Sequence, residues 1–259
     1  RMSDDGRWMK ERDDEGAAGS RSCLPRQCTV QRFMGNEALR QGVPVDSHGM
    51  MFKETILGLV LGRGSLEHQL LPIRAYDDVL QLFAKTGTRW CPTIGAFGGN
   101  GILFAKEPYL LSDPSLRAHT SPSDYDMEAA FGDLEPATIL KSYTDLLASI
   151  KQAHAMGVNI LSGTDALNPG TFYGHSLHME LRHLAQAGIP PLEVLRIATA
   201  EAASAVGAGK VLGTLTPGKL ADIVLLDKNP LDDISNTLTI WRVIQGGRVF
   251  SSRPEVEER

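Results

Sequence analysis

The stretch at residues 158–166 places the strongest constraint on the fold of this chain. Its sequence, Val-Asn-Ile-Leu-Ser-Gly-Thr-Asp-Ala, opens with an apolar run of strand length that directly follows a helical segment ending at Gly157. A strand that is apolar at nearly every position is typical of a parallel sheet covered on both faces. The run ends in Gly163-Thr164-Asp165, which predicts a carboxylate at the edge where barrels and open α/β sheets usually carry their chemistry.

Strand-like and helix-like segments alternate along the first two thirds of the chain. The patterns predict strands at 43–48, 65–68, 89–94 and 158–165, and helices at 36–41, 53–63, 76–85 and 136–156. This alternation predicts parallel strands joined by right-handed crossovers, and therefore an α/β fold. Residues 1–30 are polar and are expected to form a surface loop, whereas the insertion at 95–135 is expected to form a long binding loop or lid.

The pattern changes after Asp165. Two helices are expected at 177–187 and 191–206, followed by a small β module with a turn at Pro217-Gly218 and a two-residue hairpin at Gly246-Gly247. The sequence thus predicts three parts, namely an α/β domain at 1–207, a β module at 208–252 and a polar tail at 253–259.

Composition excludes several classes of partner. The 259 residues carry a net charge of −5, which does not favour binding to nucleic acid or to an anionic membrane surface. No apolar run approaches the roughly 18 residues of a membrane span. Cys23, Cys28 and Cys91 form no metal-ligand pattern, and their odd number favours a reducing, cytoplasmic-type compartment without fixing the localisation. Composition leaves the oligomeric state open.

Three predicted strands end in side chains that can bind a metal ion, namely His48, His68 and Asp165. Two imidazoles and a carboxylate, with one position open for water, suit Zn²⁺ or a similar divalent cation. Asp165 would then be both a ligand and the base that takes the proton of the water. A single histidine at a strand end is more often structural, and His119 and His154 are assigned to that class.

These motifs resemble those of the metal-dependent amidohydrolase superfamily, most closely its imidazolonepropionase-like branch. Val-Pro-Val-Asp-Ser-His at 43–48 and Ser-Leu-Glu-His at 65–68 are similar to the fifth and sixth barrel strands, each ending in a metal-binding histidine. Gly163-Thr164-Asp165 is similar to the eighth strand, and Pro-Gly-Lys-Leu-Ala-Asp-Ile-Val at 217–224 resembles the linker into a small β-sandwich.

The resemblance implies a partial TIM (β/α)₈ barrel, from the end of strand four to strand eight, with a small C-terminal β-sandwich. It implies a hydrolase that uses a divalent metal, most simply Zn²⁺, to cleave C–N amide bonds in a small-molecule substrate such as a cyclic amide or a small peptide. His175, ten residues after Asp165, is expected either to contact the substrate or to cap the helix that follows. His178, less favoured for that role, is expected to pack against the barrel.

The chain also departs from the family pattern. It contains no His-X-His triplet, and residues 2–6 resemble the segment just beyond the family's metal-bridging lysine. We therefore expect an incomplete chain that binds metal weakly and has no measurable hydrolase activity by itself. Two alternatives stay open, a catalytically inactive binding or assembly protein with the same fold, and a deaminase of the same superfamily.

Overall fold

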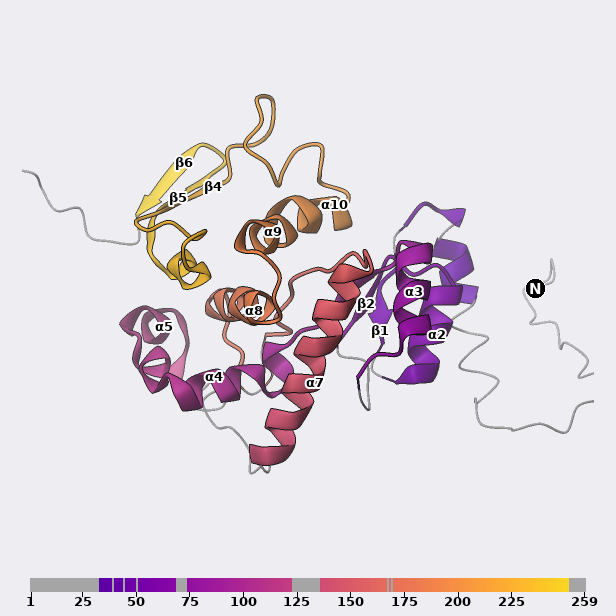
Figure 1. Ribbon diagram of the computed structural model, residues 1–259. Coiled ribbons are helices and arrows are strands. Elements are labelled where there is room, and N and C mark those ends of the chain that lie inside the picture. The colour runs from indigo at the N-terminus through magenta and orange to yellow at the C-terminus, as the bar shows by residue number, and fades with distance from the viewer. Residues whose placement is uncertain are drawn as a thin grey trace, which may run out of the picture.

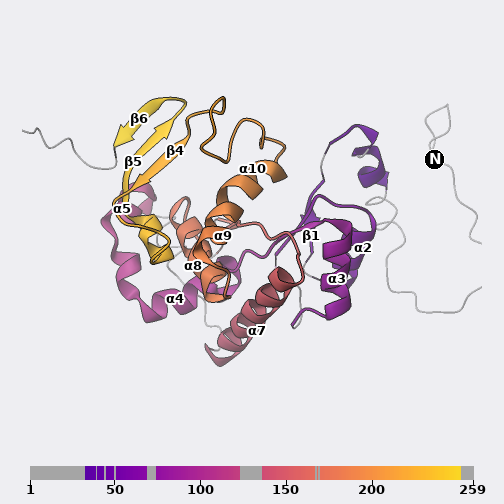
Figure 2. The same cartoon turned by 45° about the horizontal axis from the view of Figure 1, so that its top comes forward.

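The computed structural model describes residues 33–38, 40–43, 45–49, 51–68, 74–122, 136–166, 168 and 170–251. The predictions for the loop at 1–30 and the tail at 253–259 lie outside this part of the chain. Figures 1 and 2 show the α/β half of the molecule, with α2 and α3, at one end and the antiparallel strands β4 to β6 at the other.

Three short parallel strands form the first sheet, as the alternation predicts. They are β1 (Ser47–His48), β2 (Ser65–Glu67) and β3 (Arg89–Cys91), paired in the order β1-β2-β3. Helices α2 (Phe52–Val60) and α3 (Asp77–Thr86) connect them. The order along the sheet follows the order along the sequence, so consecutive strands and their helices form β-α-β units.

The predicted strand at 158–165 pairs with β3 at a single position. Trp90 and Ile160 form an isolated parallel bridge, in which the Trp90 N–H donates to Asn159 O and the Leu161 N–H donates to Trp90 O, both at 2.8 Å. The extended strand expected here is therefore reduced to one bridge. Asp165, at the end of the predicted strand, has a positive φ of 50°.

Two of the other predicted strands, at 65–68 and 89–94, end earlier than expected, before residues with a positive φ. β2 stops at Glu67 because His68 has a φ of 76°, and β3 stops at Cys91 shortly before Thr93, whose φ is 45°. A residue in this left-handed region cannot continue a strand. The apolar composition predicted the positions of the strands, but it does not predict the backbone φ angles at their ends.

Helices cover the sheet and form the main core with it. α3 presents Val79, Leu80 and Phe83 to the sheet at helical spacing and ends at Gly87, whose φ of 70° suits a glycine cap. The long helix α7 (Pro136–Ala155) runs across the molecule in Figure 1 and contributes Ile150. The most deeply buried side chains of this core include Leu59, Leu66, Leu80, Phe83, Trp90, Ile94, Ile150 and Leu184.

The expectation of a long loop at 95–135 is wrong for residues 95–119. They form a π-helical turn η1 (Gly95–Gly99), helix α4 (Asn100–Lys106), the 3₁₀ helix η2 (Pro108–Ser112) and helix α5 (Pro114–His119). Leu103, Phe104, Leu110 and Leu116 pack on Phe172 and Met179 in a second core cluster. Burial against distant residues therefore overrides the local turn signals, and the prolines stand at helix starts, where no N–H bond is lost. Residues 123–135 lie outside the described part.

The helices after Asp165 follow the prediction with one change. α8 (His175–Gln186) is continuous, whereas the second helix consists of α9 (Pro191–Arg196), a π-helical turn η3 (Ile197–Glu201) and α10 (Ala202–Ala205). In Figure 1, α8 and α9 lie between α7 and the antiparallel strands.

A second, antiparallel sheet follows in the order β4-β5-β6, formed by β4 (Ile223–Leu226), β5 (Ile240–Gln245) and β6 (Arg248–Ser251). The 3₁₀ helix η4 (Ile234–Leu238) lies between β4 and β5. Gly246 and Gly247 have φ values of 55° and 79°, as a two-residue hairpin turn with two positive φ angles requires. The described residues of this region form one sheet, so the predicted sandwich and the domain boundary at residue 208 stay predictions.

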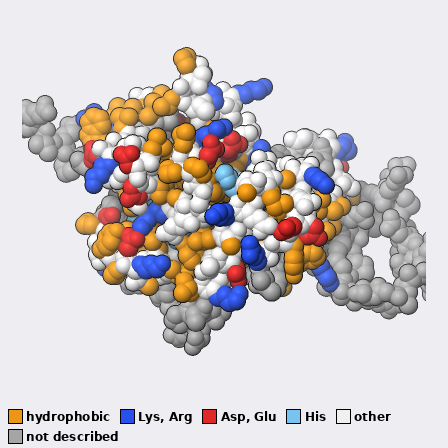
Figure 3. Space-filling model, in the orientation of Figure 1, with side chains coloured by type: hydrophobic (Ala, Val, Ile, Leu, Met, Phe, Trp, Pro, Cys, Tyr) orange, Lys and Arg blue, Asp and Glu red, His pale blue; other side chains and the backbone are white. Residues whose placement is uncertain are grey.

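The face seen in Figure 3 carries acidic and basic side chains interspersed with apolar ones, without a large patch of one charge. Exposed apolar side chains occur on the antiparallel sheet, where Val224, Trp241, Val249 and Phe250 are exposed. No helix in the described part of the chain combines the length and the hydropathy that a membrane crossing requires.

Candidate functional site

The structure brings His48, His68 and Asp165 together at the carboxyl edge of the parallel sheet. His48 is the last residue of β1, His68 follows β2, and Asp165 lies beyond the bridge at Ile160. The ring centroids of His48 and His68 are 4.5 Å apart, and His68 Nδ1 lies 3.8 Å from Asp165 Oδ2. Parallel strands end at one edge, so three side chains far apart in sequence become neighbours.

The backbone at this edge is unusual. Within the described ranges, three non-glycine residues have a positive φ, namely His68, Thr93 and Asp165. Such conformations are uncommon, and for a β-branched threonine they are genuine outliers. They cluster at functional sites because the surrounding structure must hold them in place. Gly163 adds a close approach, since a Cβ at this position would collide with the Cys91 sulfur.

Hydrogen bonds fix the members of the site. The Trp90 indole N–H donates to His68 O at 2.8 Å, and Thr93 Oγ1 lies 3.0 Å from His68 Nδ1. Asp165 Oδ2 accepts a bond of 2.7 Å from the side-chain amide of Asn168. The backbone and one ring nitrogen of His68 are thus held by two neighbours on and after β3.

Exposure and charge differ among the three residues. His68 is 5% exposed, whereas His48 is exposed and the Asp165 side chain is 42% exposed. Burial lowers the pKa of His68, while the charge of Asp165 acts in the opposite direction. A lowered pKa keeps the imidazole neutral at neutral pH, and only the neutral form can donate a lone pair to a metal ion.

The chemistry of this donor set fits a divalent cation, because two imidazoles and a carboxylate are a typical set of three protein ligands in catalytic zinc sites, where water takes the fourth position. The described residues hold no group of three or more His, Cys, Asp or Glu side chains already arranged around a common ion position. The side chains of His48, His68 and Asp165, called the trio below, are neighbours but do not yet surround one point. Rotation of Asp165 or of an imidazole would be needed before they could share an ion at about 2.0–2.2 Å.

His175 begins helix α8, after Gly174. Neither of its ring nitrogens has a hydrogen-bond partner among the described residues, although both are buried, and the same holds for Nδ1 of His178. Burial is the main cause that lowers the pKa of His175, and it lowers the pKa of His178 to about 4. The imidazole of His175 therefore does not cap the helix by a bond within the described chain.

Sequence reasoning missed two residues next to the trio. Thr93 follows β3 and contacts His68, and Phe97 in η1 packs its ring edge-on against the ring of His68, with centroids 5.5 Å apart. Thr93 stood within a predicted strand and Phe97 within a predicted loop. Only tertiary structure shows that both face His68.

Glu180 is the third missed residue, and it is fully enclosed. It is 1% exposed, and its two carboxylate oxygens accept the backbone N–H groups of Ile94 and Gly95 at 2.9 and 3.0 Å. Burial raises its pKa to about 7, against the effect of the two donors. Its place within a helix predicted neither its burial nor its partners, because most helical glutamates are solvated.

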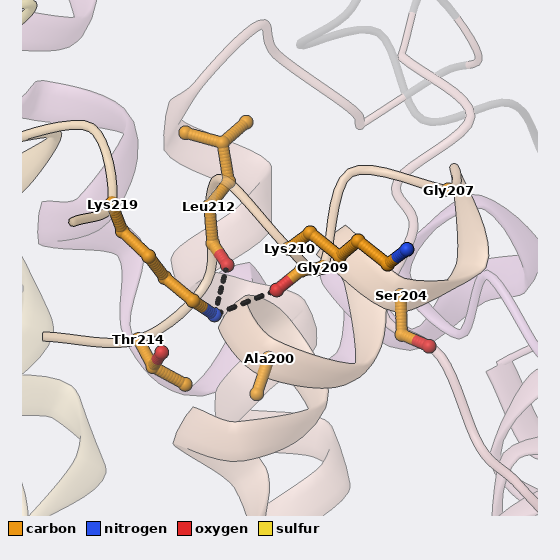
Figure 4. Close-up of a pocket in the computed structure, with 8 residues that line it drawn as sticks. All are labelled: Ala200, Ser204, Gly207, Gly209, Lys210, Leu212, Thr214 and Lys219. Carbon is orange, nitrogen blue, oxygen red and sulfur yellow. Dashed lines mark hydrogen bonds between the residues drawn. The ribbon is translucent and has the colours of Figure 1, made fainter. Parts of the chain in front are cut away.

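A hollow of about 400 Å³ lies apart from this trio, on the segment between α10 and β4. Figure 4 shows Lys219 reaching into it, where its ammonium donates to Gly209 O at 2.6 Å and Leu212 O at 3.0 Å. These bonds tie the irregular segment 209–219 to itself, so Lys219 has a structural role there.

Comparison with known proteins shows a similarity to the amidohydrolase family. A model of the amidohydrolase family matches residues 125–249. An ochratoxinase from Aspergillus niger is 35% identical over 109 residues, which cover 40% of this chain and 22% of the ochratoxinase. A 5-methylthioadenosine/S-adenosylhomocysteine deaminase from Moorella thermoacetica is 29% identical over 186 residues, or 62% of this chain and 43% of the deaminase.

Solved structures share the fold of this chain. The crystal structure of a Xaa-Pro dipeptidase with methionine bound in the active site has a TM-score of 0.64 and 22% identity, covering 85% of this chain and 48% of the dipeptidase chain. The predicted resemblance to the amidohydrolases is confirmed by the amidohydrolase-family model, which matches residues 125–249. The chain spans less than half the length of each of these relatives. The assignment to the imidazolonepropionase-like branch stays a prediction.

Proposed function

We propose that this protein is a metal-dependent hydrolase of C–N amide bonds, in which His48, His68 and Asp165 hold a divalent cation, most simply Zn²⁺. One observation carries the proposal, namely the proximity of two imidazoles and one carboxylate at the edge of a parallel sheet. The family match at residues 125–249 supports it. We further propose that the parallel strands are strands five to seven of a TIM barrel and that Ile160 marks strand eight, in line with the order β1-β2-β3 and the bridge to Trp90.

The chemistry follows from the properties of the three side chains. When bound, a divalent cation would lower the pKa of a coordinated water and polarise the carbonyl group of the substrate. Asp165 is the exposed acidic member of the trio, so its carboxylate can accept the proton of the attacking water. Water then adds its oxygen to the carbonyl carbon, the C–N bond breaks, and Asp165 delivers the proton to the leaving nitrogen.

The substrate class is a small molecule with an amide bond, either a cyclic amide or a short peptide-like compound. His48 and Asp165 are exposed, so a ligand can approach the trio from solvent, whereas Phe97 supplies an apolar ring next to His68. Known relatives include a Xaa-Pro dipeptidase and an ochratoxinase by description. His175 is proposed to contact the substrate, because its buried ring nitrogens have no partner in the described chain.

A deaminase is the second candidate, and the match to a 5-methylthioadenosine/S-adenosylhomocysteine deaminase favours it. Deamination also uses water to displace a nitrogen group, so the trio alone does not separate the two reactions. An inactive binding protein with the same fold is the third candidate. An activity assay distinguishes these three candidates, because each predicts a different product or none.

The assay uses the full-length product of the gene that encodes this chain, loaded with Zn²⁺, Mn²⁺ or Co²⁺. The substrates are N-acyl amino acids, N-acyl-prolines, a cyclic imidazolone amide, and 5-methylthioadenosine, for which ammonia release is measured. We expect amide hydrolysis that a chelator abolishes and that Asp165→Asn reduces by about 10²–10⁴-fold. Asp145→Asn is the matched control, because Asp145 lies on α7 and pairs with Lys141 on the surface.

Ammonia release without amide hydrolysis would establish the deaminase instead. Absence of all turnover in the metal-loaded protein, or full activity in Asp165→Asn, would refute the proposed function.

A further inference from the structure

We propose that Thr93 and Glu180 are positioning residues for His68. In this arrangement the Thr93 hydroxyl holds Nδ1 of His68 so that Nε2 is the nitrogen offered to the cation, and Glu180 holds the strained backbone that presents Thr93. The proposal rests on the function proposed for the trio and adds a mechanism that fixes the orientation of one ligand.

The first contact is between two buried side chains. Thr93 is 3% exposed and His68 is 5% exposed, and their Oγ1 and Nδ1 atoms are 3.0 Å apart. Asp165 Oδ2, at 3.8 Å from the same nitrogen, lies beyond hydrogen-bond distance. Thr93 is therefore the side chain in hydrogen-bond contact with Nδ1.

The state of one ring nitrogen fixes the other. In a neutral imidazole one nitrogen carries the proton and the other carries the free lone pair. If Nδ1–H donates to Thr93 Oγ1, the lone pair is on Nε2. Metal-binding histidines commonly donate their second ring N–H in this way, and loss of such a partner typically costs 10–100-fold in metal affinity.

Thr93 contacts His68 from a strained backbone position. A φ of 45° is unfavourable for a β-branched residue, so the neighbouring structure must hold it. The two residues that follow, Ile94 and Gly95, donate their N–H groups to the two oxygens of one carboxylate, that of Glu180.

Glu180 comes from helix α8 and is almost fully enclosed. Its two oxygens accept the two backbone N–H groups, and loss of the carboxylate would leave these donors without partners. Glu180 of α8 therefore holds the turn after β3, and Thr93 in that turn contacts His68. None of these steps requires Glu180 or Thr93 to touch the substrate.

Two variants of Thr93 separate the hydroxyl from the shape of the side chain. Thr93→Val keeps the β-branch but removes the hydroxyl, whereas Thr93→Ser keeps the hydroxyl. In the metal-free protein, ¹⁵N NMR of His68 should show the Nδ1–H tautomer in wild type and Thr93→Ser, and a shift towards the Nε2–H tautomer in Thr93→Val. Zinc affinity, measured by competition with a chromophoric chelator, should fall by about 10–100-fold in Thr93→Val and stay near wild type in Thr93→Ser.

Glu180→Gln tests the second step, because the amide has one oxygen acceptor for the two N–H groups. It should weaken zinc binding in the same direction as Thr93→Val. Glu193→Gln is the matched control on the exposed surface of α9, where Glu193 contacts Arg196, and should leave zinc affinity unchanged. Urea unfolding of each variant identifies any that fails to fold, and Thr93→Ala then replaces Thr93→Val.

The outcomes distinguish this proposal from the proposed function. A His68 tautomer and a zinc affinity that are the same in wild type, Thr93→Val and Thr93→Ser would overturn the positioning role even if the trio binds zinc. A wild-type protein that shows the Nδ1–H tautomer, lost in Thr93→Val, but binds no zinc would support the positioning role and refute the function proposed for the trio.

Discussion

Three residues at the rim, His68, Thr93 and Asp165, adopt a backbone conformation that side chains other than glycine rarely take. His68 and Asp165 were predicted from sequence as candidate metal ligands, because His and Asp at strand ends can bind a metal ion. Thr93 was not, since a threonine in an apolar run is typical of a strand, and the two residues after it bond to Glu180 on the distant helix α8. At this scale the sequence predicts candidate ligands, whereas their orientation depends on residues distant in the chain.

His175 provides a prediction at the scale of a single side chain. Its ring nitrogens are buried without hydrogen-bond partners in the described chain, as expected for a side chain that binds a ligand. In the active protein, His175→Ala should lower kcat/KM, while the zinc content per protein stays that of wild type. His154→Ala on the exposed face of α7 is the control. Loss of zinc together with activity would make His175 a ligand instead, and unchanged kinetics would exclude substrate contact.

Helices α4, α7 and α8 are joined by a buried chain of hydrogen bonds. The Tyr143 hydroxyl lies 3.0 Å from His183 Nδ1, His183 Nε2 lies 3.1 Å from Asn100 Oδ1, and the Asn100 amide donates to Gly170 O at 2.8 Å. This chain connects the helices of the insertion to the segment that follows Asp165. The sequence predicted α7 and α8 from their apolar spacing, but it predicted a loop where α4 forms. Helix formation there depends on the burial of Leu103 and Phe104 against Phe172 and Met179.

The buried network predicts a dependence of stability on pH. Burial lowers the pKa of His183 from 6.5 to about 3, so the folded state keeps this imidazole neutral while the unfolded state protonates it below about pH 6.5. The free energy of unfolding should therefore fall as the pH drops from 6.5 towards 3, with a slope approaching about 1.4 kcal/mol per pH unit from this group.

The measurement compares urea unfolding of wild type and His183→Gln between pH 7.5 and pH 4.5. Glutamine can keep a hydrogen bond but does not titrate, so the difference between the two proteins isolates His183 from opposing groups such as Glu180, whose raised pKa favours the folded state at lower pH. The advantage of wild type over the variant should shrink as the pH falls. A difference independent of pH would contradict the neutral, buried state of His183.

At the scale of the whole molecule, a parallel sheet gathers the candidate site and an antiparallel sheet lies at the other end. The alternation of segments predicted the parallel sheet and the glycine pair predicted the hairpin, because both rest on local periodicity and turn chemistry. The second core under α4 and α5 could not be predicted, since it forms between segments far apart in the chain. The same holds for the contact between Glu180 and the turn after β3.

The central claim is that His48, His68 and Asp165 jointly hold a divalent cation. Anomalous diffraction at the zinc edge from crystals of the protein soaked in Zn²⁺ tests it most directly. The account predicts one peak within about 2.0–2.2 Å of an Asp165 carboxylate oxygen and one nitrogen of each imidazole, with Nε2 as the ligand atom of His68. A zinc peak bound elsewhere, or no peak at these three side chains in a saturated crystal, would contradict it.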